Sequence, residues 1–164
     1  MNFNTITPVT VTEPPVTRSS LPVKIVLKAG AKIPFYAIGG CSGVDLCALL
    51  SEPVVLSVGQ RYLVPTGLFI SIPDGYEAQI RSRSGMALNH GVSVLNSPGT
   101  IDAGYRGEIK VLLINLGQEP FVIEPNARVA QCVFAPVEQV VFHVVQDLEP
   151  SERNQDGFGS TGMH

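Results

Sequence analysis

Short runs of apolar residues, separated by turn-forming residues, recur along most of the chain. Val23, Ile25 and Leu27 occupy every second position, and this period of two predicts a half-buried β-strand. Turn signals such as Pro73-Asp74-Gly75 and Ser97-Pro98-Gly99 separate the later runs. These runs are Val54–Val58, Arg61–Val64, Gly67–Ile72, Glu77–Arg81, Val92–Leu95, Glu108–Leu116, Phe121–Ile123, Arg128–Phe134 and Val140–Val145. So many short strands predict an antiparallel β-barrel or a jelly-roll sandwich.

One short helix is expected within this β-rich pattern. It spans about Gly85 to His90, and Ser84 precedes it as the expected N-cap. The predicted fold class is therefore all-β, a jelly-roll or β-barrel domain with one short helix.

The chain divides into three regions by composition. Residues 1–22 are rich in Thr, Val and Pro, which predicts an extended N-terminal arm. Residues 23–148 carry the strand pattern and form the predicted β-barrel domain. Residues 149–164 contain Gly157, Gly159 and Gly162 and few apolar anchors. We expect this last region to be a flexible C-terminal arm unless a ligand orders it.

The composition excludes several classes of protein. The chain has 164 residues with 16 Gly and 13 Pro, too many helix-resistant positions for a helical bundle. With 45% hydrophobic residues it can bury enough apolar surface to fold as one domain rather than remain disordered. A net charge of −3 argues against a broad basic surface, so no nucleic acid polymer is expected as a partner.

The cysteines and the start of the chain predict an intracellular protein. Cys41, Cys47 and Cys132 are an odd number, without C-x-x-C spacing or a histidine at metal-ligand spacing. We expect free thiols in a reducing compartment, and neither a disulfide framework nor a structural zinc site. No signal peptide and no apolar stretch of membrane-spanning length is visible. A cytoplasmic or nuclear location, with no membrane partner, is therefore expected.

Three polar stretches carry candidate chemistry. Arg81-Ser82-Arg83-Ser84-Gly85 precedes the expected helix, where free backbone N–H groups and arginine suit an anion. The stretch 96–107 contains Asn96 to read a base edge, Asp102 to deprotonate water and Tyr105 to pack on a sugar or base. The stretch 153–162 combines glycines with an arginine and a phenylalanine, which suits a closing loop over phosphates. Taken singly, these stretches also fit a solvated strand end, ordinary turn geometry and a flexible linker.

Two shorter elements complete a set of five. They are Ser42-Gly43-Val44-Asp45-Leu46 and Arg128-Val129-Ala130-Gln131. In this order, from about Lys24 to Gly162, the five motifs closely resemble the trimeric dUTP pyrophosphatases, or dUTPases. The resemblance implies a jelly-roll homotrimer with C-terminal arm exchange, in which each active site draws on three subunits. It also implies Mg²⁺-dependent water attack on the α-phosphate of dUTP. The products, dUMP and pyrophosphate, would keep uracil out of DNA and supply dUMP for dTMP synthesis.

The resemblance implies a role for each matching residue. Asp102 is the catalytic carboxylate that activates water, and Gln131 helps to hold water or phosphate. Asp45 matches the first-motif aspartate, near metal-bound waters at most or at a subunit interface, because the triphosphate itself holds most of the Mg²⁺ coordination. The expected substrate contacts are Arg83, Ser84 and Gly85 on phosphate; Asn96, Gly99, Thr100, Ile101 and Asp102 around uracil; Tyr105 under deoxyribose; Lys110 as a further contact; and Arg153, Phe158, Gly159 and Ser160 in the closing arm.

The chain departs from the family pattern in two motifs. Ser82 stands where the second motif usually has proline, and we expect it to loosen that loop slightly. Asn154 and Asp156 replace two glycines of the fifth motif, so arm closure is expected to be weaker or differently shaped. Two alternatives remain: a dCTP deaminase, which has a similar phosphate grip, and a non-catalytic protein of the same fold that binds or signals.

Overall fold

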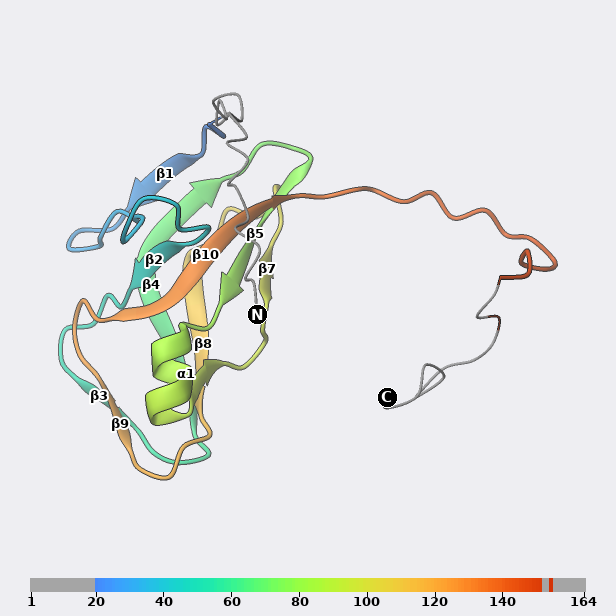
Figure 1. Cartoon of the computed structure of the whole chain (residues 1–164). Coiled ribbons are helices and arrows are strands. Elements are labelled where there is room, and N and C mark those ends of the chain that lie inside the picture. The colour runs from blue at the N-terminus through green and yellow to red at the C-terminus, as the bar shows by residue number, and fades with distance from the viewer. Residues whose placement is uncertain (1–19, 152–153, 155–164) are drawn as a thin grey trace, which may run out of the picture.

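The computed structural model describes residues 20–151 and residue 154, and its regular elements are ten β-strands and one helix within that part of the chain. The elements are β1 (Lys24–Leu27), β2 (Val44–Cys47), β3 (Val54–Leu56), β4 (Arg61–Ser71), β5 (Tyr76–Arg81), α1 (Ser84–His90), β6 (Val92–Val94), β7 (Gly99–Ile101), β8 (Ile109–Asn115), β9 (Phe121–Ile123) and β10 (Arg128–Pro136). Figure 1 shows their arrangement. The prediction of a mostly β fold with one short helix is confirmed.

Two four-stranded sheets form the body of the molecule. One has the strand order β1-β4-β8-β6 and the other β2-β10-β5-β7, while β3 and β9 form a separate two-stranded sheet. Every pairing between these strands is antiparallel. Neighbours in the sheets are mostly distant in sequence, so residues from separate motifs are brought onto adjacent strands.

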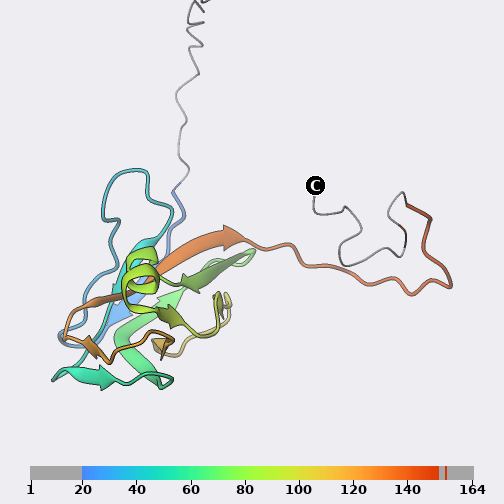
Figure 2. The same ribbon diagram turned by 60° about the horizontal axis from the view of Figure 1, so that its bottom comes forward.

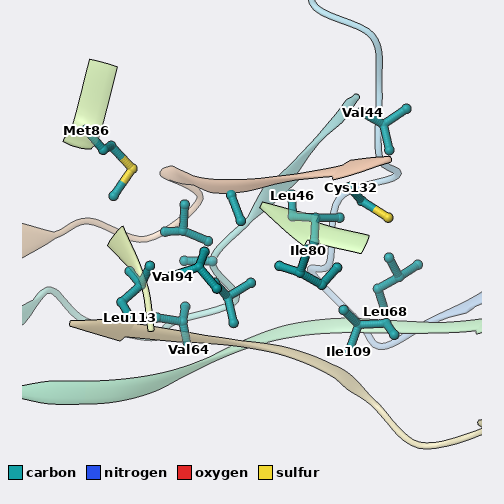
Figure 3. Close-up of a cluster of buried hydrophobic side chains, with 14 of the residues drawn as sticks. Val44, Leu46, Val64, Leu68, Ile80, Met86, Val94, Ile109, Leu113 and Cys132 are labelled. Carbon is teal, nitrogen blue, oxygen red and sulfur yellow. The ribbon is translucent and has the colours of Figure 1, made fainter. Parts of the chain in front are cut away.

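The core lies between the two four-stranded sheets, as Figure 3 shows. On β8, Ile109, Val111 and Leu113 are buried, whereas Lys110 between them is exposed. This alternation follows from the pleat, which sends successive side chains to opposite faces. Leu46 and Ile80 of the second sheet point toward the same space (Figure 3). The pleat therefore selects which residues of β8 enter the core, since Leu112 and Ile114 are apolar as well but only half-buried.

Strand β4 merges two predicted strands, Arg61–Val64 and Gly67–Ile72. The register against β8 shifts between Pro65 and Leu68, and Gly67 there has φ +67°. A Cβ on Gly67 would lie 2.8 Å from the Cβ of Ala31, so both the conformation and the space require glycine. Proline and glycine within the pattern mark a bulge in one strand rather than a break between two.

Two strands were not predicted from the sequence. Strand β2 lies within the polar motif around Asp45, and β7 directly follows the Ser97–Pro98 turn. Both are short and pair with longer strands, β2 with β10 and β7 with β5. Their pairing partners, rather than their own composition, make them strands.

The helix lies where it was expected, but its N-cap is different. Arg83 is the N-cap residue, in extended conformation and without a side-chain capping bond, so the prediction of Ser84 as N-cap is wrong. Ser84 instead begins the first turn. At the other end Gly91 has φ +66°, and its N–H donates to the carbonyl of Ala87 at 3.0 Å. A left-handed glycine thus ends the helix after two turns.

The segment after β10 has no strand, so the prediction of a strand over Val140–Val145 is not met. Figures 1 and 2 show this segment leaving the body of the sandwich after Pro136. Its large apolar side chains are exposed, with Phe142 at 89% and Val144 at 100%. A run of six mostly apolar residues with no partner in the described chain lacks the packing that a strand requires.

Residues 1–19 of the N-terminal arm lie outside the described residues. The three region boundaries therefore remain predictions. Cys41, Cys47 and Cys132 are all free, as expected. Within the described part of the chain, α1 is far too short to cross a bilayer and no other helix could do so.

Candidate active site

Asp45 lies at the centre of a charged cluster formed by β2, β10 and the start of α1. Its Oδ1 is 3.3 Å from Nε of Arg83, and its Oδ2 accepts a hydrogen bond from Nη1 of Arg128 at 3.0 Å. Nη1 of Arg83 also donates to the carbonyl of Arg128 at 3.1 Å. The Asp45 side chain is only 11% exposed, so water screens these contacts weakly. The cluster holds the Arg83 guanidinium in one place before any ligand arrives.

Gln131 lies next to Asp45 on the same rung of the sheet. In register, Gln131 of β10 pairs with Asp45 of β2 on one side and with Arg81 of β5 on the other. Directly opposed residues point to the same face, so three polar side chains from three strands form one row. A Cβ on Gly43 would lie 2.7 Å from Oε1 of Gln131, so glycine there leaves room for the amide.

Ser82 connects this row to the helix start. Its carbonyl accepts a hydrogen bond from Nε2 of Gln131 at 2.9 Å, and its hydroxyl accepts one from the N–H of Val94 at 2.9 Å. The serine side chain ties the loop to β6, and the expectation that serine loosens this loop relative to proline stays a prediction. We refer to Asp45, Ser82, Arg83, Arg128 and Gln131 as the arginine cluster.

Ser84 and Gly85 form the exposed first turn beside the arginine cluster. The first N–H groups of a helix have no partner within it, so they are available to an acceptor. A Cβ on Gly85 would meet nothing within 4 Å, which shows open space in front of this turn. An arginine, a hydroxyl and free N–H groups at an open surface match the predicted phosphate site.

The stretch 96–107, which we call the hairpin, lies along the other edge of β5. Gly99, Thr100 and Ile101 form β7, which pairs with Ile80, Gln79 and Ala78. A Cβ on Gly99 would lie 3.1 Å from Nδ2 of Asn96 and 3.3 Å from the Cβ of Ile80. Glycine at this position therefore lets the Asn96 amide lie against β7.

Asp102 and Tyr105 occupy the turn at the end of β7. Asp102 is exposed, and its carboxylate is in no ion pair with the described residues. The N–H of Tyr105 donates to the carbonyl of Asp102 at 3.0 Å, and the Tyr105 hydroxyl donates to the carbonyl of Glu108 at 3.1 Å. A Cβ on Gly107 would lie 2.6 Å from Cζ of Tyr105, so the ring packs directly on that glycine. The turn thus presents a free carboxylate beside a fixed aromatic ring.

Asp102 and Gln131 of one chain lie too far apart to act on one water molecule. Ile101 pairs with Ala78, which places Asp102 level with Glu77, whereas Gln131 pairs with Arg81. The two levels are about 13 Å apart along β5, and β7 and β10 flank β5 on opposite sides, about 10 Å apart. A shared water needs both groups within about 3 Å. Asp102 and the arginine cluster therefore form two separate polar regions of the chain, on opposite sides of β5.

The remaining predicted residues lie elsewhere. Lys110 is exposed on β8 opposite Pro65, in the sheet that does not contain β7. Strand pairing therefore does not bring Lys110 beside the hairpin residues. Arg153, Phe158, Gly159 and Ser160 lie outside the described residues.

A protein-only magnesium site is absent from the described part of the chain. No group of three or more His, Cys, Asp or Glu side chains gathers there. Asp45, the predicted metal-proximal residue, already has both carboxylate oxygens on guanidinium groups. Mg²⁺ prefers six oxygen ligands and usually takes several from water and substrate phosphates. The described carboxylates alone therefore do not supply such a set of ligands, and the placement of Asp45 near metal-bound waters stays a prediction.

The cysteines near the arginine cluster are poor nucleophiles. Burial, together with the nearby Asp45 charge, raises the pKa of the Cys47 thiol. Burial raises the pKa of Cys132 to about 12. Since the thiolate is the reactive form, neither group favours covalent catalysis at neutral pH.

Three residues of this region were not among the predicted site residues: Gly43, Ser82 and Arg128. Each stands inside a quoted motif, two positions before Asp45, directly before Arg83 and three positions before Gln131. Their contacts run between strands far apart in sequence, such as Arg128 with Asp45. Proximity to a motif residue was the available signal, but the partners themselves could be found only in the folded chain.

The fold is that of a β-sandwich protein, and its two polar regions have the chemistry that an anionic, base-containing ligand requires. A family model for dUTPase matches residues 29–162. The chain is 56% identical over 140 residues to a deoxyuridine 5'-triphosphate nucleotidohydrolase of Cytophaga hutchinsonii, covering 85% of this chain and 91% of that protein. It is 53% identical over 137 residues to the protein of that name from Chlamydia muridarum, covering 83% and 94%.

Solved structures agree with these sequence relatives. The dUTPase of Staphylococcus bacteriophage 80alpha with dUPNHPP superposes with a TM-score of 0.77 at 27% identity, covering 88% of this chain and 99% of that one. The chain therefore belongs to the dUTPase family.

Proposed function

We propose that this protein hydrolyses dUTP to dUMP and pyrophosphate, as a dUTP diphosphatase. The observation that carries the proposal is the pairing of a prearranged arginine cluster with an exposed carboxylate on a separate hairpin. The arginine cluster suits binding of a triphosphate, and the exposed carboxylate suits activation of water. The sequence relatives that bear the name of this activity cover most of the chain, which supports the same reaction.

In this mechanism Asp102 accepts a proton from a water molecule as the water oxygen attacks the α-phosphorus. The bond from that phosphorus to the bridging oxygen breaks, and pyrophosphate leaves with the bonding electron pair. Arg83 and the first-turn N–H groups at Ser84 and Gly85 hold the phosphate oxygens, and Gln131 orients water or phosphate. Bound Mg²⁺ would neutralise phosphate charge and align the triphosphate for this displacement.

The hairpin is proposed to select the nucleotide. Asn96 and the backbone from Gly99 to Asp102 would pair with the edge of uracil, leaving no space for the C5-methyl group of thymine. The amino group of cytosine would place donors against donors and leave them unpaired. Tyr105 would pack under deoxyribose, where a ribose hydroxyl would collide. Selectivity would therefore come from a short backbone-lined turn rather than from charge.

Each active site is proposed to combine the hairpin of one subunit with the arginine cluster of another, in a homotrimer. The separation of Asp102 from Gln131 within one chain supports this division. The closing arm with Arg153, Phe158, Gly159 and Ser160 would come from the third subunit. A complete site would then exist only in the assembled trimer.

The exposed segment after β10 is proposed to join the subunits. Its apolar side chains, Val140, Val141, Phe142 and Val144 among them, are 69–100% exposed. An apolar groove of about 930 Å³ lies along β1 and β10 of the sandwich, lined by side chains such as Ile25, Ile70 and Phe134. Burying the segment in the groove of a second copy would remove both surfaces from water. The strand that the sequence predicts at Val140–Val145 would form there.

Pyrophosphate release tests the activity directly. Purified protein is given dUTP, dTTP, dCTP or UTP, with Mg²⁺ or with chelator. We expect release from dUTP with Mg²⁺ and at least about 100-fold less from the other three nucleotides. Release of ammonia from dCTP would indicate the deaminase, and binding of dUTP without turnover would indicate the non-catalytic alternative.

Mixed trimers test the shared site. Asp102→Asn chains and Arg83→Ala chains are unfolded together, refolded together and compared with each variant refolded alone. If hairpin and cluster come from different chains, about a quarter of the sites in random mixtures contain both native parts. Activity near a quarter of the wild-type value supports sharing. No gain over the parents, in mixtures verified as mixed trimers by native mass spectrometry, contradicts it.

The proposed reaction takes place inside the cell, where nucleoside triphosphates are made and used. The free thiols of Cys41, Cys47 and Cys132 fit a reducing compartment. A cytoplasmic or nuclear location is therefore part of the proposal.

A further inference from the structure

Ser82 makes two hydrogen bonds that point in different directions. Its carbonyl accepts from the Gln131 amide at 2.9 Å, which joins it to β10. Its hydroxyl accepts from the Val94 N–H at 2.9 Å, which joins it to β6. β6 and β10 belong to different sheets, so this one residue connects the two layers of the sandwich.

The Ser82 hydroxyl accepts a hydrogen bond from the backbone N–H of Val94, which has no other partner in its own sheet. β6 is an edge strand whose neighbour is β8, and the next N–H along, that of Leu95, donates to Leu112 of β8 at 2.8 Å. Successive N–H groups of a strand point to opposite sides, so the Val94 N–H points away from β8. Val94 is only 3% exposed, and water cannot readily replace the hydroxyl. Losing the hydroxyl would leave a buried donor unpaired.

We propose that Ser82 is a positioning residue that sets the phosphate-binding segment and the base-reading hairpin relative to one another. Arg83 follows it directly in the sequence, and Val94 leads through Leu95 into Asn96. A shift at Ser82 therefore moves the Arg83 guanidinium through the chain and the Asn96 amide through the hydrogen bond to Val94. The kinetic effect expected here rests on the proposed hydrolysis of dUTP. The hydrogen bond between Ser82 and Val94 can be tested independently of that function.

The catalytic carboxylate is anchored independently of Ser82. Asp102 follows β7, which is held by its own pairing with β5 and by the turn bond to Tyr105. Removing the Ser82 hydroxyl should therefore weaken binding of the ground state and transition state alike, and change the chemical step less. Such a loss raises KM and leaves kcat nearly unchanged.

The test compares Ser82→Ala with Ser82→Thr and with Ser93→Ala. Ser93 is the matched control, because it lies beside Val94 on β6 and its hydroxyl makes no hydrogen bond with the described residues. We expect Ser82→Ala to raise KM for dUTP, and Kd for dUPNHPP, by about tenfold, with kcat within about threefold of wild type. Ser82→Thr keeps the hydroxyl, so its KM and Kd should lie close to the wild-type values. Ser93→Ala should have the KM, Kd and kcat of wild type.

Amide hydrogen exchange supplies a readout that does not depend on activity. In Ser82→Ala the Val94 amide should exchange at least about tenfold faster, while the Leu95 amide, bonded to Leu112, keeps its protection. Three results would each overturn the proposal. The first is unchanged exchange at Val94 in Ser82→Ala, and the second is an equal rise in KM and Kd in Ser93→Ala. The third is a fall in kcat as large as the rise in KM. If Ser82→Ala does not fold, Ser82→Cys is used, which keeps the size with a much weaker acceptor. Wild type without activity on dUTP would instead refute the proposed function, and the exchange result would still decide the role of Ser82.

Discussion

The arginine cluster and the hairpin hold their polar groups in different ways. In the cluster, Asp45 is buried and both of its carboxylate oxygens contact guanidinium groups. Its charge therefore holds Arg83 and Arg128 in position. In the hairpin, Asp102 is exposed and its carboxylate has no ion pair with the described residues. The Asp45 carboxylate is thus held inside the cluster, whereas the Asp102 carboxylate is left accessible at the surface. The two aspartates therefore differ in their surroundings, and their proposed roles differ accordingly.

The two regions also differ in what fixes their backbone. Side chains from β2, from β10 and from the loop between β5 and α1 fasten the cluster, through Asp45, Gln131 and Ser82. The hairpin is fastened by its own short-range bonds, such as that from Tyr105 to Glu108, and by close packing on Gly107. Disturbing the cluster should therefore affect stability as well as binding, while disturbing the hairpin should affect activity alone.

The largest effect is expected from Asp102→Asn. Removing the base should lower kcat by about 10²–10⁴-fold or more, because asparagine cannot accept the proton from water. Binding of dUPNHPP, measured by calorimetry, should stay within about threefold of wild type. Asp74→Asn, an exposed aspartate in the turn before β5, is the matched control and should retain full activity. Turnover in Asp102→Asn close to wild type would remove Asp102 from the catalytic role.

Asp45→Asn should disturb stability, in contrast to Asp102→Asn. It leaves Arg83 and Arg128 without a counter-charge and should lower the free energy of unfolding by about 1–3 kcal/mol. Urea denaturation of both variants measures the difference, and Asp102→Asn should lie within about 0.5 kcal/mol of wild type. Equal stabilities for the two variants would show that the cluster is not the more firmly held region.

Gly107→Ala should change substrate binding without unfolding the protein. The added methyl group would lie 2.6 Å from Cζ of Tyr105 and must push the ring out of its place. We expect KM for dUTP to rise by about tenfold, because the ring would no longer pack under the sugar. Gly104→Ala is the control in the same hairpin, since a Cβ there meets nothing within 4 Å. Similar kinetics for the two variants would argue against a role for the Tyr105 ring.

The smallest effect concerns the base of the hairpin, where Glu108 joins it to the bulge of β4. Lys28 donates to Glu108 at 2.7 Å and the Gly67 N–H donates at 2.9 Å, and these bonds hold the pKa of Glu108 below its ordinary value of 4.5. Such a carboxyl stabilises the fold above its unfolded pKa, and this stabilisation is lost as the pH falls through the folded pKa.

Glu108→Gln should therefore be less stable than wild type at pH 7, by less than about 1 kcal/mol, because Lys28 is half exposed. The difference should shrink as the pH falls below 4.5 and disappear once the pH has fallen through the lowered pKa of Glu108 in the folded protein. Thermal unfolding at a series of pH values measures it. The control is Glu124→Gln, an exposed residue without an ion pair in the described chain. A difference that is constant with pH would show that the Glu108 charge is not responsible.

Much of the fold could be predicted from the sequence because local patterns determine it. The apolar run Glu108–Leu116 and the stretch from Gly85 to His90 predicted a strand and a helix close to the observed β8 and α1. The short strands β2 and β7 could not be predicted, because their partners β10 and β5 make them strands. For Val140–Val145 the opposite holds: the composition favours a strand, but the described chain offers no partner.

For the site, too, some features could be predicted from the sequence and others depend on the tertiary structure. The residue types at Arg83, Asn96, Asp102 and Gln131 follow from the sequence, because chemistry requires particular side chains at particular spacings. Their grouping was decided by strand order alone. Pairing across β2, β10 and β5 brings Asp45 and Gln131 together and places Asp102 on the far side of β5. Hydrogen bonding between distant strands has no local signature in the sequence, so only the tertiary structure could show which of these side chains lie together and which lie apart.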